Sequence, residues 1–93
     1  MSVVILGGNE RMVRNYKDLC KEYKCDAKIF TEMTTSLRKQ IGNPDLLVLF
    51  TSTMSHKMVR VALDEVDGTE VKIARSHTSS MAALRRILAE NVA

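Results

Sequence analysis

The sequence predicts an α/β fold: a small open parallel sheet of four strands with helices on both faces. Three observations lead to this prediction. Strand-like runs and amphipathic helix-like runs alternate four times along the 93 residues. No internal repeat, low-complexity tract or linker divides the chain, and its length suits one domain, residues 1–93. Two of the four strand-like runs are continuously apolar, as central parallel strands are when helices cover both faces.

The first strand and helix are predicted from the amino-terminal segment. Val3–Leu6 is continuously apolar and rich in β-branched side chains, which is typical of a central strand. Gly7–Gly8 permits a tight turn, and Asn9 is a good cap for a helix. Apolar side chains then recur every three or four positions, which predicts a helix over about residues 10–24.

The second strand is predicted at an edge of the sheet. In Ala27–Thr31 the apolar run is interrupted by Lys28, as edge strands often are to discourage stray pairing. A short helix over about residues 36–41 follows. Gly42 and Pro44 end it, because a helix rarely continues through this combination.

The third strand is predicted to be central and the fourth to form the other edge. Leu46–Phe50 is the most apolar run in the chain, and a helix over about residues 56–66 follows it. Glu70–Ala74 alternates polar and apolar side chains, which favours an edge strand. Ser79 or Ser80 then caps the last helix.

Two central and two edge strands give the strand order 2-1-3-4, a Rossmann- or flavodoxin-like three-layer sandwich. Right-handed crossovers place the first and last helices on the same face of this sheet. In such sheets, ligands bind outside the carboxyl ends of the strands where the strand order reverses, here between strands one and three. We therefore expect a site at this edge.

Polar residues gather in the three strand-to-helix loops that reach this edge. Helix N-termini, arginines and hydroxyl groups are the groups that bind phosphate or carboxylate, so the sequence predicts a site for a small anion. The candidate ligand-binding residues are Gly7, Gly8, Asn9, Arg11, Thr51, Thr53, Ser55, His56, Arg75, Ser76, His77, Ser79 and Ser80.

Simpler interpretations stand beside this one. The glycines are also explained by a strand-to-helix turn, Ser55 and Ser79 by helix capping, and the arginines by ordinary surface positions. Alternatively, His56 and His77 hold a divalent metal, with Glu10 or a hydroxyl completing the shell.

A catalytic role has less support in the sequence than binding. A histidine-activated serine requires a third group to orient the histidine, and these loops contain no Asp. The residues therefore favour a binding or regulatory module over an enzyme, with phosphoryl transfer as a further alternative. They assign no catalytic residue and no cofactor.

The composition limits which binding partners and which cellular compartment we expect for this chain. The net charge of +3 and the pI near 9.1 are compatible with an anionic partner but too small to predict nucleic acid binding. Cys20 and Cys25 fit neither a disulfide framework nor a zinc site, which favours the reducing cytoplasm. No apolar run is long enough for a signal peptide or a membrane helix, so we expect no membrane association. A homodimer is compatible with so small a domain.

Three motifs together resemble a family of small bacterial proteins of unknown function, DUF2325. They are Gly7-Gly8-Asn9-Glu10-Arg11-Met12, Ser55-His56-Lys57-Met58 and Arg75-Ser76-His77-Thr78-Ser79-Ser80-Met81, and the resemblance runs essentially end to end. It supports the fold and the choice of residues, and it implies no ligand.

The size and strand order also look like those of the IIB phosphoryl carriers of sugar phosphotransferase systems. Those carriers have a nucleophilic cysteine directly after the first strand. Here Gly7 and Gly8 occupy that loop and the nearest cysteine, Cys20, lies within the helix. Phosphoryl transfer through cysteine is therefore not supported.

Overall fold

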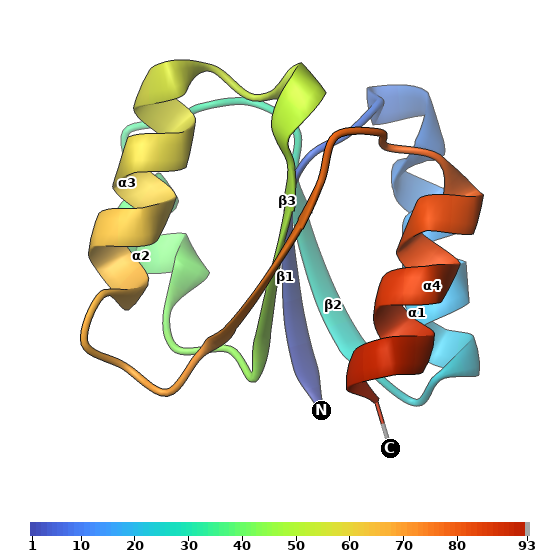
Figure 1. The fold of residues 1–93 in the computed structure, drawn as a ribbon. Helices are drawn as coiled ribbons and strands as arrows, with labels where there is room; N and C mark the ends of the chain where they lie inside the picture. Colours follow the sequence, from blue (N-terminus) through green and yellow to red (C-terminus); the bar gives the residue numbers. More distant parts are fainter. Residues whose placement is uncertain (93) are drawn as a thin grey trace.

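Four parallel strands form one sheet in the computed structural model, which describes residues 1–92 (Figure 1). The strands are β1 (Ser2–Gly7), β2 (Asp26–Phe30), β3 (Leu46–Phe50) and β4 (Lys72–Ser76). They lie in the order β2-β1-β3-β4, and each neighbouring pair is parallel, so the predicted order is confirmed. Ala93, the last position of the predicted domain, lies outside the described residues.

Helices cover both faces of this sheet, which confirms the three-layer α/β fold. The helices are α1 (Val13–Glu22), α2 (Leu37–Ile41), α3 (His56–Val66) and α4 (Met81–Asn91), with short 3-10 segments η1 (Glu10–Met12) and η2 (Thr51–Thr53). Figure 1 shows α2 and α3 on one side of the sheet and α1 and α4 on the other. None of the helices in the described part of the chain has the length and apolar character needed to cross a membrane.

The two central strands are the middle of the core. Every residue of Val3–Leu6 and Leu46–Phe50 is at most 3% exposed, as the continuous apolar runs predict. Alternate side chains of these strands contribute to two separate apolar clusters. One includes Tyr16 of α1 and Leu84 of α4, and the other includes Leu37 of α2 and Met58 of α3.

The first predicted helix is divided in the structure. Residues 10–12 form η1, and α1 begins at Val13. Asn9 explains the division, because its Oδ1 accepts a hydrogen bond from the Arg11 N–H at 2.9 Å and its C=O accepts one from the Met12 N–H at 2.8 Å. These short-range bonds favour a 3-10 turn before the α-helix starts.

The fourth strand begins two residues later than Glu70, where it was predicted to start. The Thr69 hydroxyl donates to the Val66 C=O at 2.6 Å and accepts from the Val71 N–H at 3.3 Å. This threonine holds the chain in a turn after α3, so the prediction of a strand starting at Glu70 was wrong for its first two residues.

Candidate functional site

The three loops that carry the candidate site residues lie side by side at the carboxyl-terminal end of the sheet. The Gly8 N–H donates to Thr53 Oγ1 at 2.6 Å, which joins the loop after β1 to the segment after β3. Thr51 Oγ1 donates to the Ser76 C=O at 3.4 Å, which joins that segment to the end of β4. Three stretches far apart in the sequence are therefore neighbours at one edge (Figure 1).

The two glycines after β1 are required by packing. Both have positive φ, 88° at Gly7 and 89° at Gly8. A Cβ on Gly7 would lie 2.8 Å from Met54 Cγ, from the Phe50 C=O oxygen and from Thr53 Oγ1. The chain's own atoms therefore fill the space beside Gly7, where the strand order reverses. This packing accounts for Gly7 without a ligand.

The serines before α3 and α4 are helix caps. Ser55 Oγ and Ser80 Oγ each accept a hydrogen bond at 3.1 Å from a backbone N–H in the first turn of their helix. Of the two candidates for the last cap, Ser80 is therefore the one used. Ser79 contributes its carbonyl oxygen, which accepts from Tyr16 Oη at 2.7 Å.

Arg11, His56 and His77 are exposed and are not connected to one another by any side-chain hydrogen bond or ion pair among residues 1–92. Arg11 lies in η1, which leads into α1 on one side of the sheet, whereas His56 begins α3 on the other side (Figure 1). Across the same residues, no group of three or more His, Cys, Asp and Glu side chains is arranged to hold a metal ion.

An acidic pair lies beside the loop that carries Arg11. The pKa of the Glu10 carboxyl is raised, because it shares a hydrogen bond with the Glu32 carboxyl and because the negative charge of Glu32 lies close by. Glu10 follows β1 and Glu32 follows β2, so both belong to the carboxyl-terminal end of the sheet. Their charge opposes an anion at this part of the edge.

Basic side chains meet hydroxyl groups further along, between β4 and α4. A cavity of about 300 Å³ is lined there by Arg75, Ser76, Thr78, Ala83, Arg86, Ile87 and Glu90. Arg75 and Ser76 are predicted site residues, but sequence reasoning did not select Arg86 or Glu90. The spacing of these two residues could have identified them, because positions 83, 86, 87 and 90 share one face of a helix.

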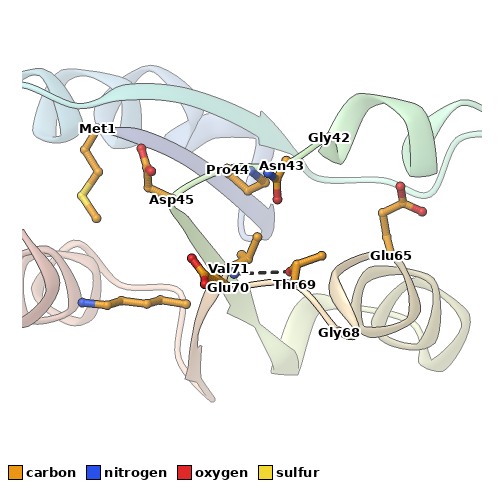
Figure 2. Close-up of a pocket in the computed structure, with 11 residues that line it drawn as sticks. Met1, Gly42, Asn43, Pro44, Asp45, Glu65, Gly68, Thr69, Glu70 and Val71 are labelled. Carbon is orange, nitrogen blue, oxygen red and sulfur yellow. Dashed lines mark hydrogen bonds between the residues drawn. The ribbon is translucent and has the colours of Figure 1, made fainter.

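A wider hollow of about 1060 Å³ lies at the opposite, amino-terminal end of the sheet (Figure 2). Its lining includes Met1, Asp45, Glu65 and Glu70. Two of these carboxylates have structural partners, since Asp45 accepts from the Ser2 N–H at 2.7 Å and Glu65 pairs with Arg38 at 3.5 Å. The sequence did not predict this hollow, which lies among turn residues.

The chain belongs to the family described as uncharacterized proteins conserved in bacteria (DUF2325), because the family model matches residues 2–91. This match confirms the resemblance carried by the three motifs. No curated protein and no solved structure matches the chain.

Proposed function

We propose that this member of the DUF2325 family binds a small anionic ligand, of the size of a phosphate or a carboxylate-bearing molecule, between β4 and α4. The observation that carries the proposal is the cavity of about 300 Å³, which has both Arg75 and Arg86 in its lining. It lies at the lower end of the volume range of small-ligand sites, roughly 300–1000 Å³.

The lining of the cavity suits an anion chemically. Guanidinium groups form charge-assisted, often bidentate hydrogen bonds with phosphate and carboxylate oxygens. The Ser76 hydroxyl already donates to the Thr78 C=O at 2.7 Å, so Thr78 is the hydroxyl that adds a weaker donor, and Ala83 and Ile87 line the cavity with apolar surface. Neither Arg75 nor Arg86 forms an ion pair with a side chain of residues 1–92. The Arg86 charge is therefore available to a ligand from α4. Arg75 is in register with Leu49 of the α2 and α3 cluster, so its guanidinium has to pass round the β4 edge to reach the same ligand.

The state of the thiols argues against covalent chemistry through a cysteine. Burial, with a smaller contribution from Cys25, raises the pKa of the Cys20 thiol to about 11, so it stays protonated near neutral pH. Cys25 is buried as well. A module that senses or carries a small anion in the reducing cytoplasm is consistent with two free, inert cysteines.

The experiment is a titration with inorganic phosphate, sulfate and mononucleotides, followed by calorimetry and by the midpoint of thermal unfolding. Saturation at about 100 times the dissociation constant stabilises the folded chain by roughly 2.7 kcal/mol. Arg86→Gln removes one charge-assisted hydrogen bond of roughly 1.5–3 kcal/mol, so affinity falls at least about tenfold. Arg75→Gln acts in the same direction.

Two variants on the same helix make the test specific. Arg85 points elsewhere, because its guanidinium pairs with Glu22 at 3.6 Å, so Arg85→Gln changes the net charge equally but leaves affinity nearly unchanged. Glu90→Gln removes the negative charge from the cavity lining and strengthens binding. The proposal is wrong if no anion stabilises the chain, or if Arg85→Gln weakens binding as much as Arg86→Gln does.

A further inference from the structure

One row of side chains, with one residue from each strand, crosses the sheet on a single face. The residue at one edge of the sheet differs in character from the residue at the other edge. The strand registers place Lys28, Val4, Leu47 and Ile73 side by side in this order. Val4 and Leu47 belong to the apolar cluster under α2 and α3, so the whole row faces that layer. At the β2 edge the row ends in a lysine, the residue that edge strands use against pairing. At the β4 edge it ends in Ile73, which is 42% exposed.

The backbone of β4 also offers free hydrogen-bonding groups at this position. All five residues of β4 are in register with β3, and the Lys72 N–H donates to the Asp45 C=O at 3.3 Å, so the backbone groups of Lys72 face β3. In a parallel ladder the residues that bond to one neighbour alternate with residues that point away from it. The N–H and C=O groups of Ile73 and Arg75 therefore lie in the plane of the sheet and point away from β3, towards the edge that has no neighbouring strand.

We propose that a second copy of this chain docks on this edge, with its β4 antiparallel to the first β4 and a two-fold axis at Ile73. The pairing joins the two four-stranded sheets into one continuous sheet. The two Ile73 residues form a hydrogen-bonded pair, in which each donates its N–H to the C=O of the other. Their exposed side chains meet on the face that carries α2 and α3.

Charge excludes the registers centred on Lys72 and Arg75, and the contact between the two Ile73 side chains distinguishes this register from the one centred on Ala74. With the axis at Ile73, Arg75 lies opposite Val71 of the second copy, and Lys72 lies opposite Ala74. With the axis moved to Lys72 or Arg75, two like charges lie directly opposite each other, which is destabilising. With the axis at Ala74, the two Arg75 side chains become diagonal neighbours and the isoleucines no longer oppose each other. The axis at Ile73 keeps only a diagonal approach of two Lys72 side chains on the other face.

The dimer does not require a bound anion, because its determinants are Ile73 and the β4 backbone, although Arg75 also lines the cavity. The experiment is sedimentation or light scattering of the chain over a range of concentrations, without added ligand. The expected mass is twice 10.4 kDa at high concentration. Ile73→Lys gives the β4 edge the same residue that ends the row at β2, and it shifts the chain to monomer.

Lys28→Ala is the matched control at the other end of the same row, and its mass stays that of the wild type. A cysteine variant tests the register without relying on the stability of Ile73→Lys. Paired residues have Cα atoms about 5.5 Å apart, within the range of a disulfide, so Ile73→Cys forms a cross-linked dimer under mild oxidation. Arg75→Cys does not, because the two copies of this residue are far apart in this register.

Three results would overturn the inference. The first is a wild-type chain that stays monomeric at the highest accessible concentration. The second is a dimer that survives Ile73→Lys or is lost in Lys28→Ala, since either result places the interface elsewhere. The third is equal cross-linking of Ile73→Cys and Arg75→Cys in a chain whose native thiols, Cys20 and Cys25, are buried.

Discussion

Both ends of the sheet have glycines in turns, but these glycines have different structural roles at the two ends. At the carboxyl-terminal end, Gly7 and Gly8 are surrounded by atoms of other segments. At the amino-terminal end, Gly42 and Gly68 also have positive φ, but a Cβ on either would meet no atom within 4 Å. The first pair is needed for conformation and for close packing, whereas the second pair is needed for conformation alone.

This difference accompanies a difference in shape. At the carboxyl-terminal end, hydrogen bonds from Gly8 to Thr53 and from Thr51 to Ser76 hold the loops against one another. At the amino-terminal end, the loops around Gly42 and Gly68 separate to leave the wide hollow of Figure 2. A shared turn signal therefore does not predict whether the surrounding surface is closed or open.

The largest expected effect is that of Gly7→Ala. The new methyl group meets the Phe50 carbonyl oxygen, a backbone atom of a central strand that cannot easily move, and the positive φ adds strain. Overpacking costs roughly 1–3 kcal/mol and a left-handed residue roughly 1–2, so we expect a loss of about 2–5 kcal/mol in unfolding free energy. Denaturant unfolding measures this loss.

Gly68→Ala is its matched control, because it introduces the same methyl group at φ 76° into open space. Only the backbone strain remains, so the loss is about 1–2 kcal/mol. Equal losses in the two variants would contradict the contrast between a packed end and an open one.

The next effect concerns the interior beneath the amino-terminal end, where α1 finishes. Cys20 is fully buried, and its thiol has a pKa of about 11 because burial disfavours the thiolate. The folded pKa lies above that of the unfolded chain, which is near 9. The folded state therefore retains the proton longer, and this contribution to stability is present below pH 9 and is lost as the pH rises through about 11.

The measurement is the change in unfolding free energy between pH 9 and 11 in the wild type and in Cys20→Ala. Each unit of pKa shift corresponds to about 1.4 kcal/mol, so the wild type loses about 2–3 kcal/mol more than the variant. All other side chains are common to both proteins, so their contribution cancels in the comparison. Equal losses in the two proteins would mean that water reaches the Cys20 thiol in the folded chain. The amino-terminal end would then be open to solvent in its interior and not only at its surface.

The sequence predicted those features that depend on local pattern. The apolar runs Val3–Leu6 and Leu46–Phe50 led to the central strands and hence to the strand order, and Ser55 was correctly identified as a cap. The start of β4 was missed, because the alternation at Glu70 also occurs in a turn when a neighbouring hydroxyl such as that of Thr69 binds the backbone.

The candidate site was harder to predict, because it depends on contacts between distant segments. That the space beside Gly7 is filled by Met54 follows from the geometry of two loops and not from either loop alone. Arg86 was missed because helical periodicity assigns it only to an outer face, and the pattern does not show that β4 ends beside that face. The sequence therefore predicts a site at the carboxyl-terminal end of the sheet, and it does not predict the cavity between β4 and α4.

The smallest of these effects tests how the carboxyl-terminal end is held together. Tyr16 is buried, and its hydroxyl donates to the Ser79 C=O at 2.7 Å and accepts from the Asn9 N–H at 3.4 Å, so it joins the loops after β1 and β4. Tyr16→Phe leaves the ring packed and the Ser79 carbonyl without this donor, which costs about 1–2 kcal/mol of unfolding free energy.

Tyr23→Phe is the control, because within residues 1–92 the hydroxyl of this half-buried tyrosine forms no hydrogen bond. The expected loss in this variant is below about 0.5 kcal/mol. If the two variants are equally stable, the hydrogen bonds of the Tyr16 hydroxyl add nothing, and this end is held by the packing of Gly7 and Gly8 and by the bonds from Gly8 to Thr53 and from Thr51 to Ser76.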